Sequence, residues 1–131
     1  KRSLRLLVAD DNIVNQTVAR RMLMGLGHHV EVVSDGQEAL DKLAQQPYDA
    51  VLMDCHMPGL DGYETARRIR AGVVPGIPVH VRIIALTASA MPEDRAACFD
   101  AGMDDFVSKP IRHKEMDTAL DRVGGEAIRS A

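Results

Sequence analysis

Short apolar runs alternate with longer amphipathic stretches, and this alternation restricts the fold of the chain more than any other feature. The runs are apolar almost throughout and bounded by turn-forming residues, which is typical of buried strands. They cover residues 4–9, 29–33, 49–53, 79–86 and 106–108. Strands that are apolar on both faces predict a parallel sheet covered by helices on both sides. Right-handed crossovers make this a doubly wound, flavodoxin-like α/β fold of five parallel strands in the order 2-1-3-4-5.

The stretches between these runs carry helix signals. Residues 12–27 place Val14, Val18, Met22 and Leu26 four positions apart, and we interpret them as one buried stripe. Ser34 and Gln37 form a capping-box pattern, which predicts a helix that starts after Ser34 and buries Ala39, Leu40, Leu43 and Ala44.

Three further helices complete the alternation. One is expected over 62–70, where Arg67, Arg68 and Arg70 are interpreted as a solvated basic face. Another begins near Pro92. The last is expected over 112–123, because two glycines follow it.

Composition limits the domain count and the class of protein. The chain has 131 residues, of which 46% are hydrophobic and 27% are charged, so we expect one domain with a core over 4–123 and a C-terminal tail over 124–131. A net charge of −3 argues against non-specific nucleic-acid binding. No apolar run approaches the roughly 20 residues of a membrane helix. Cys55 and Cys98 show no zinc-site spacing, which suits a reducing compartment.

Polar residues follow four of the five predicted strands. Asp10 and Asp11 follow the first, Asp54 the third, Thr87 the fourth and Lys109 the fifth. The carboxyl ends of parallel strands meet at one edge of the sheet, and ligands bind there. The first and third strands are neighbours in the expected order. The three carboxylates are therefore predicted to share one pocket.

Such a cluster needs a compensating charge. Each ionised pair at 4–5 Å costs roughly 3–4 kcal/mol at an effective dielectric constant near 20. Mg²⁺ is the natural partner, since it takes carboxylates, water and phosphate oxygens as ligands. Asp54 is central and could act as a nucleophile that forms an aspartyl phosphate. Thr87 and Lys109 then offer a hydroxyl and a positive charge to the phosphoryl oxygens.

Each residue alone also has a structural explanation. Asp11 or Asn12 could cap the first helix, and Asp54 could be a loop carboxylate. Thr87 could cap a helix or form a local turn, and Lys109 could be a solvated surface residue. The functional interpretation rests on the joint pattern, in which these residue types end successive strands.

Two other functions share parts of this pattern. A phosphatase of the haloacid dehalogenase type expects a second acid two residues after the nucleophile, where this chain has His56. A flavodoxin-like FMN carrier needs a first loop that holds phosphate, which Asp10 and Asp11 would repel without a metal.

Four segments carry a family resemblance. They are 7–12 (Leu-Val-Ala-Asp-Asp-Asn), 53–62 (Met-Asp-Cys-His-Met-Pro-Gly-Leu-Asp-Gly), 84–88 (Ile-Ala-Leu-Thr-Ala) and 109–110 (Lys-Pro). With these segments the chain resembles the receiver, or response-regulator, domain of bacterial two-component systems over about 4–123. The residues in these segments are most similar to those of receivers fused to hybrid sensor histidine kinases.

The resemblance implies a phosphorylation and metal site. Asp54 would be the phosphoacceptor, taking a phosphoryl group from a phosphohistidine. Asp11 and Asp54 would ligate Mg²⁺ together with the backbone carbonyl of His56, and Asp10 would hold a metal-bound water. The resemblance also implies that the domain catalyses only its own phosphorylation and dephosphorylation.

Further roles follow from the same resemblance. Thr87 and Lys109 would bind the phosphoryl oxygens, and the Lys109–Pro110 peptide bond would be cis. Phe106 would be the switch aromatic that follows Thr87 inward, where many relatives carry tyrosine. His56 and Ser89 occupy positions that tune the lifetime of the phosphate.

The implied partners are the dimerisation and phosphotransfer domain of a histidine kinase, or a histidine-containing phosphotransfer protein. We expect a cytoplasmic domain that is monomeric in isolation and contacts neither nucleic acid nor membrane. The chain begins with Lys1 rather than Met, which favours a piece of a hybrid kinase whose parent could be anchored in the inner membrane. A stand-alone or N-terminal receiver of a response regulator, and a receiver-fold docking module without phosphorylation, stay open as alternatives.

Overall fold

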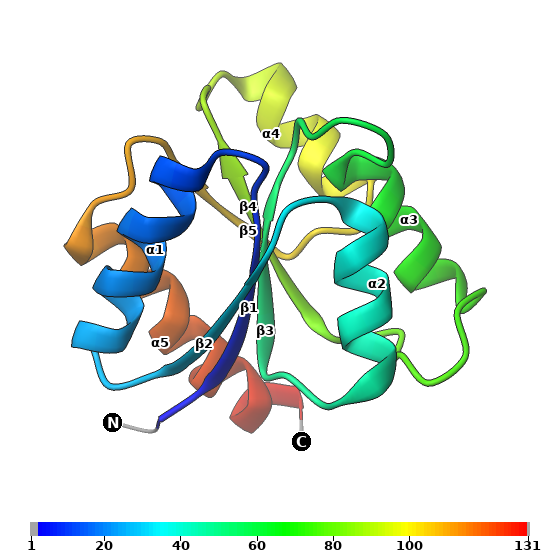
Figure 1. Ribbon diagram of the computed structural model, residues 1–131, viewed down its shortest axis with the longest axis horizontal. Coiled ribbons are helices and arrows are strands. Elements are labelled where there is room, and N and C mark those ends of the chain that lie inside the picture. Colours follow the sequence, from blue (N-terminus) through cyan, green and yellow to red (C-terminus); the bar gives the residue numbers. More distant parts are fainter. Residues whose placement is uncertain (1–2, 131) are drawn as a thin grey trace.

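A five-stranded parallel sheet forms the centre of the molecule (Figure 1). The computed structural model describes residues 3–130, with side chains described for 3–123. The strand order is β2-β1-β3-β4-β5, which confirms the predicted fold and order. The strands are β1 (Arg5–Ala9), β2 (His29–Val33), β3 (Ala50–Asp54), β4 (Arg82–Thr87) and β5 (Asp105–Ser108).

Helices cover both faces of the sheet, as Figure 1 shows. One apolar core joins the sheet to two helices, α1 (Ile13–Gly25) and α5 (His113–Ser130). A second core on the opposite face joins it to α2 (Gly36–Gln45), α3 (Gly62–Ala71) and α4 (Pro92–Asp100). The division follows the alternation of side chains along the strands. In β1, Leu6 belongs to the first core and Leu7 to the second. None of the described helices combines the length and apolarity that crossing a membrane requires.

The strand register brings the predicted polar residues to one edge. Ala9 in β1 pairs with Met53 in β3, so the next residues, Asp10 and Asp54, are neighbours across the two strands. At the other side of the sheet Thr87 in β4 pairs with Ser108 in β5. The site predicted from strand ends therefore lies on neighbouring strands.

The buried stripe predicted for α1 is wrong in its first half. Val14 is 68% exposed and Val18 is 43% exposed, whereas Ala19 and Leu23 are buried. A step of four residues turns an α-helix about 40° past a full turn, so residues spaced by four gradually leave one face. Ile13, at 74% exposure, extends this apolar surface. We call Ile13, Val14 and Val18 the α1 patch.

The start of α2 lies one residue later than the capping pattern predicts. Asp35, not Ser34, is the N-cap, and its carboxylate accepts a hydrogen bond of 2.8 Å from the backbone N–H of Glu38. Glu38 in turn accepts from the backbone N–H of Ser34 at 2.8 Å. An aspartate adjacent to the serine offers the same acceptor chemistry, so either could begin the helix. Ala44 is exposed rather than buried.

The basic face predicted for α3 contains only two of its three arginines. Arg67 and Arg68 are exposed and pair with Glu64. Arg70 is turned inward, and its guanidinium donates four hydrogen bonds. The acceptors are the carbonyl oxygens of Val79 (2.6 Å), Val81 (2.8 Å) and Gly102 (2.8 Å) and Oδ2 of Asp104 (2.7 Å). Arg70 therefore fastens α3 to the segments that flank β4.

The last helix does not stop at the glycine pair that was expected to end it. The α5 backbone is helical from His113 to Ser130, seven residues past the predicted end at Val123. A glycine inside a helix costs about 1 kcal/mol relative to alanine, which weakens a helix without breaking it. Side chains after Val123 lie outside the described part, so the expectation of a tail over 124–131 stays a prediction.

Candidate functional site

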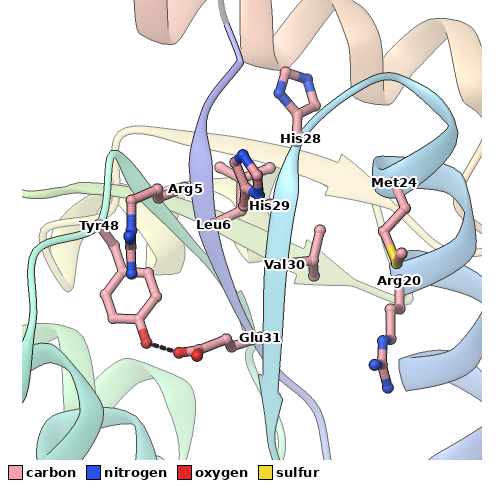
Figure 2. Close-up of a pocket in the computed structure, with 9 residues that line it drawn as sticks. All are labelled: Arg5, Leu6, Arg20, Met24, His28, His29, Val30, Glu31 and Tyr48. Atoms are coloured by element: carbon pink, nitrogen blue, oxygen red, sulfur yellow. Dashed lines mark hydrogen bonds between the residues drawn. The ribbon is translucent and has the colours of Figure 1, made fainter.

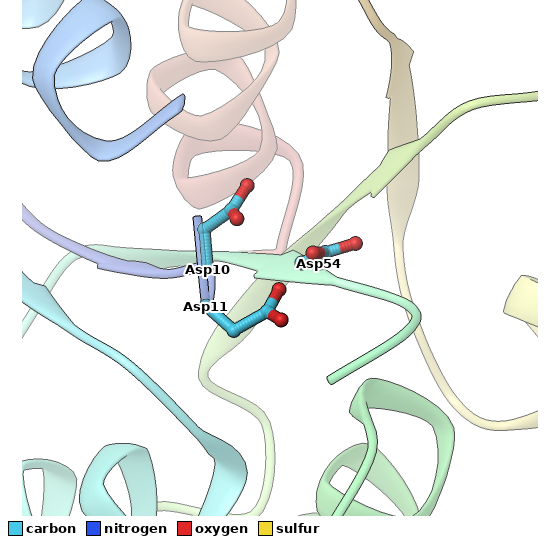
Figure 3. A group of neighbouring side chains, drawn as sticks. All are labelled: Asp10, Asp11 and Asp54. Atoms are coloured by element: carbon cyan, nitrogen blue, oxygen red, sulfur yellow. The ribbon is translucent and has the colours of Figure 1, made fainter. Parts of the chain in front are cut away.

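Three carboxylates gather where β1 and β3 end (Figure 3). Asp10 and Asp11 follow β1, and Asp54 is the last residue of β3. Each offers a carboxylate oxygen, and these oxygens lie within 4.8 Å of one another. Asp10 and Asp54 are buried, whereas Asp11 is exposed at the rim. The pocket is thus open to solvent on the side of Asp11.

One cation faces this cluster from the end of β5. Nζ of Lys109 lies 3.2 Å from Oδ2 of Asp10 and 3.2 Å from Oδ1 of Asp54. A lysine can neutralise one of the three carboxylates, so two formal negative charges are left uncompensated among these four residues. A divalent cation carries the charge that balances them.

The donor set fits a hard divalent cation. Oδ2 of Asp10 is buried and accepts no well-directed hydrogen bond from the described residues, although the Lys109 ammonium lies within ion-pair distance. Buried carboxylate oxygens normally have such partners. Clustered carboxylate oxygens next to an open rim are the ligands that Mg²⁺ prefers, since it keeps several waters.

The turn after β1 holds Asp10 through its own backbone. Oδ1 of Asp10 accepts a hydrogen bond of 2.9 Å from the backbone N–H of Asn12, which is also the N-cap of α1. Nε2 of Gln16 donates to the carbonyl oxygen of Asp10 at 2.6 Å. Gln16 is not among the site residues predicted from the sequence, because nothing in its local sequence indicates this contact.

A glycine fixes the backbone around Asp54. A Cβ atom added to Gly62 would lie 2.2 Å from the carbonyl oxygen of Asp54 and 3.0 Å from Cα of Cys55. The backbone N–H of Gly62 also donates to the carbonyl oxygen of Cys55 at 3.1 Å. Only glycine allows the start of α3 to pass this close, so the loop after β3 has little room to move.

Burial and charge act on both members of the central ion pair. Burial raises the pKa of Asp54, and the neighbouring charge of Lys109 offsets only part of this increase. Burial lowers the pKa of Lys109, but Asp54 and Asp10 outweigh it, and the pKa of Lys109 is raised overall. Lys109 is therefore a permanent cation at neutral pH, whereas ionised Asp54 is in a costly environment.

Thr87 lies at the end of β4 with its hydroxyl engaged in a local turn. Oγ1 of Thr87 donates to the carbonyl oxygen of Ser89 at 2.9 Å and accepts from the backbone N–H of Ser89 at 3.1 Å. Thr87 is buried and Ser89 is half-buried. The structure thus brings Thr87 to the predicted edge but directs its hydroxyl to its own loop.

The other predicted site residues surround this edge. His56 is exposed, and its backbone N–H lies 3.3 Å from Oδ1 of Asp54. The Lys109–Pro110 peptide bond is cis, the isomer that the resemblance implies. Phe106, on β5, is half-buried.

The ring of Phe106 contacts two side chains of α4. It packs edge-on against the ring of Phe99, with ring centres 6.4 Å apart, and the guanidinium carbon of Arg95 lies 5.3 Å from the centre of the Phe106 ring. Phe99 is 48% exposed. The aromatic predicted to switch is therefore held at the surface between β5 and α4.

A hollow at the other end of the sheet is a weaker candidate for the functional site than the acidic edge. It has a volume of about 400 Å³ and lies beside the edge strand β2 (Figure 2). Two of its polar groups are paired with the fold: Nδ1 of His28 accepts from the backbone N–H of Leu4 at 3.0 Å, and the Tyr48 hydroxyl donates to Glu31. Burial and the bond to Glu31 raise the pKa of Tyr48 to about 12. We therefore place the functional site at the acidic edge. The nine residues that line the hollow are Arg5, Leu6, Arg20, Met24, His28, His29, Val30, Glu31 and Tyr48.

Comparison with curated proteins places the chain among signalling proteins. Hybrid signal transduction histidine kinase L of Dictyostelium discoideum is 41% identical over 123 residues, which cover 92% of this chain and 7% of that protein. The sensory/regulatory protein RpfC of Xanthomonas campestris is 38% identical over 121 residues, or 92% of this chain and 16% of that protein. The chain thus spans less than a fifth of the length of these two relatives.

Solved structures agree with these relatives. The receiver domain of sensor histidine kinase PA1611 from Pseudomonas aeruginosa PAO1 has a TM-score of 0.83 and 44% identity, covering 94% of this chain and 99% of that one; a magnesium ion is coordinated in its active site cleft. Chemotaxis protein CheY4 of Vibrio cholerae has a TM-score of 0.81 and 26% identity, covering 93% of this chain and 99% of that one. The family model of the response regulator receiver domain matches residues 6–121. On this evidence, the chain belongs to the response regulator receiver domain family.

Proposed function

We propose that the chain accepts a phosphoryl group on Asp54 in a two-component phosphorelay. The observation that carries this proposal is the position of Asp54, whose buried carboxylate lies between the acidic pair Asp10 and Asp11 and the ammonium of Lys109. An anionic nucleophile next to a cation and a metal-binding set suits phosphoryl transfer, which depends mainly on positioning and charge neutralisation.

The transfer balances without a further reactant. A carboxylate oxygen of Asp54 forms a bond to the phosphorus of a phosphohistidine. The N–P bond breaks, and the leaving imidazole keeps the electron pair. In a separate step that ends the signal, a water oxygen attacks the phosphorus, the bond to Asp54 breaks, and inorganic phosphate leaves. The domain thus catalyses its own phosphorylation and dephosphorylation.

Mg²⁺ is the proposed cofactor. Asp11, Asp54 and the backbone carbonyl of His56 would ligate it, and Asp10 would hold a metal-bound water. The magnesium ion in the PA1611 receiver domain supports this assignment for a relative of 44% identity. When bound, Mg²⁺ neutralises charge on the carboxylates and on the incoming phosphoryl oxygens.

The remaining site residues take the roles that the family resemblance implies. Lys109 binds a phosphoryl oxygen through the ammonium that now faces Asp54. Thr87 binds another after leaving its turn with Ser89. His56 and Ser89 occupy the positions that tune the lifetime of the phosphate. Phe106 reports the change by moving inward.

The donor is a histidine-containing domain, either the dimerisation and phosphotransfer domain of a kinase or a separate phosphotransfer protein. The α1 patch supports this, because α1 starts directly after the loop that carries Asp10 and Asp11 and exposes three apolar side chains there. Exposed apolar groups that adjoin one another are typical of interaction surfaces. A donor helix seated on Ile13, Val14 and Val18 would bring its histidine to this edge.

A hybrid sensor histidine kinase is the proposed parent, located with this domain in the cytoplasm and anchored in the inner membrane by other segments. Hybrid kinases among the curated relatives support this assignment. CheY4 among the structural neighbours keeps a stand-alone receiver as the alternative.

Incubation with acetyl phosphate and Mg²⁺, followed by intact mass measurement, tests the function. The wild type should gain one phosphoryl group, and Asp54→Asn and an EDTA-treated sample should gain none. Beryllofluoride, which mimics an attached phosphoryl group, should bind the wild type even if hydrolysis is too fast to trap the product. A folded protein that neither gains mass nor binds beryllofluoride would favour a docking module instead.

A further inference from the structure

Two thiols meet beside the acidic edge. Sγ of Cys55 lies 3.6 Å from Sγ of Cys98, and both side chains are fully buried. Cys55 directly follows Asp54, whereas Cys98 lies 43 positions later in α4. We propose that Cys55 and Cys98 form a redox modification site, at which a peroxide converts the pair into a disulfide that fastens α4 to the loop after β3.

The two sulfurs are close to bonding position. A disulfide bond is about 2.05 Å long, so the sulfurs must approach by roughly 1.5 Å. The backbone of Cys55 is hydrogen-bonded on both sides, since its N–H donates to the carbonyl oxygen of Leu86 at 3.2 Å and its carbonyl oxygen accepts from the N–H of Gly62 at 3.1 Å. We therefore expect the movement to come from Cys98. A Cβ atom on Gly62 would already lie 3.0 Å from Cα of Cys55 and 2.2 Å from the carbonyl oxygen of Asp54, so this backbone has no free space on that side.

The helix that carries Cys98 buries little of its own surface in the core. Cys98 is the one buried residue of α4, a helix that lies wholly within the described part of the chain. The N-cap residue, Met91, makes no side-chain capping bond, and Phe99 is 48% exposed. A small shift of α4 toward β3 therefore closes the gap at little cost in packing. The disulfide is expected to move α4 and to leave the loop of Asp54 in place.

The reaction balances with one molecule of hydrogen peroxide. A thiolate attacks one peroxide oxygen, the O–O bond breaks, and the leaving oxygen takes up the thiol proton as water. The sulfenic acid that results is attacked by the second sulfur, the S–O bond breaks, and a second water leaves. The two sulfurs are oxidised and the peroxide is reduced.

Burial sets the rate of this reaction. Both thiols are fully shielded from solvent. The pair therefore reacts only when α4 opens, more slowly than an exposed thiol. Once one sulfur is oxidised, the second is already in contact with it, so disulfide formation is favoured over further oxidation.

Intact mass after peroxide treatment of the reduced, folded chain tests the proposal. After alkylation in denaturant, the wild type should be lighter by two hydrogen atoms and carry no alkyl group, and dithiothreitol should restore two alkylatable thiols. Cys55→Ser and Cys98→Ser should show no such loss. Cys98→Ala serves as a second variant in case serine is not tolerated in the core. Two alkylated thiols, or separate oxygen adducts on each cysteine, in the folded wild type would overturn the proposal.

Amide exchange tests where the disulfide acts. Exchange over residues 92–100 should become slower in the oxidised protein, and unchanged exchange there would overturn the fastening of α4. These readouts do not depend on the proposed function. One further consequence rests on the proposed function. Because α4 follows the turn of Thr87, the oxidised protein should be labelled by acetyl phosphate more slowly than the reduced protein. Loss of labelling without a disulfide would count against the proposed function alone.

Discussion

Oδ1 of Asp54 lies 3.2 Å from the ammonium nitrogen of Lys109, so the proposed nucleophile is already one half of an ion pair. This ion pair offsets only part of the cost of burying the ionised carboxylate of Asp54. Burial raises the pKa of Asp54 by more than the charge of Lys109 lowers it, so ionised Asp54 costs folding free energy when no metal is bound.

Asp54→Asn is therefore expected to stabilise the metal-free protein at neutral pH. An increase in Tm of a few degrees is expected, the shift that about 1 kcal/mol produces in a domain of this size. Because the folded pKa lies above the ordinary value of 3.8, the unfolding free energy of the wild type falls as the pH rises through the folded pKa. The advantage of Asp54→Asn should thus shrink as the pH falls toward 3.8. Melting curves in EDTA across this pH range would check it, and a lower Tm for the variant at neutral pH would contradict it.

Mg²⁺ should stabilise the wild type more than Asp11→Ala. A ligand at 100 times its Kd adds about 2.7 kcal/mol to the folded state, and loss of a ligand oxygen reduces this at the same concentration. Thermal melts with and without Mg²⁺ measure the difference. Asp41→Ala, an exposed aspartate on α2 outside the cluster, is the control and should respond like the wild type. Equal increases in Tm on addition of Mg²⁺ for all three proteins would show that Asp11 does not contribute to Mg²⁺ binding.

Arg70 should contribute far more to stability than Arg67, although both are on α3. Arg70→Ala removes four hydrogen bonds and leaves Asp104 without its closest cation, which should cost about 2–3 kcal/mol. Arg67→Ala removes an exposed pair with Glu64 and should change stability by about 0.5 kcal/mol or less. Urea unfolding of both variants tests this. Similar urea midpoints for the two variants would mean that the four hydrogen bonds of Arg70 are not formed in solution.

Val14→Ser should slow transfer from a histidine donor and leave the fold unchanged. Val14 is 68% exposed, so its loss from the free domain should cost about 0.5 kcal/mol or less. An apolar contact at the centre of an interface is worth more than 1 kcal/mol, so transfer should slow by about tenfold. Labelling by acetyl phosphate should not change.

Val73→Ser is the matched control for Val14→Ser. Val73 is 63% exposed and lies in the segment between α3 and β4, outside the α1 patch. Any phosphorylated donor domain that labels the wild type can be used. Equal slowing by both variants would show that the α1 patch is not the donor surface.

The sequence was sufficient for the sheet and for the acidic edge, and the reason is physical. Strands buried on both faces leave a nearly continuous apolar signal, and polar residues at their carboxyl ends must meet wherever parallel strands do. The α1 patch was misread because residues spaced by four drift about 40° per step around a helix, so the apolar pattern did not show which of them face the core. Arg70 was misread because charge type alone does not show which way a side chain turns.

Contacts between distant segments were beyond the sequence analysis for a different reason. Cys55 is buried, and its partner Cys98 lies 43 positions away. Gln16 likewise reaches back to Asp10 from inside a helix. Neither position carries a local signal, since each contact depends on how the helices are seated on the sheet.

Under the proposed function, the turn between Thr87 and Ser89 couples the phosphorylation site to α4. The Thr87 hydroxyl has one proton, and that proton is committed to the carbonyl oxygen of Ser89. Binding a phosphoryl oxygen requires that this bond be given up, and the loop that leads into α4 must rearrange with it. By thermodynamic reciprocity, a partner that holds the loop in its present shape opposes phosphorylation, and one that prefers the rearranged loop promotes it to the same degree. Partner proteins that bind this loop would therefore also change how readily the domain is phosphorylated.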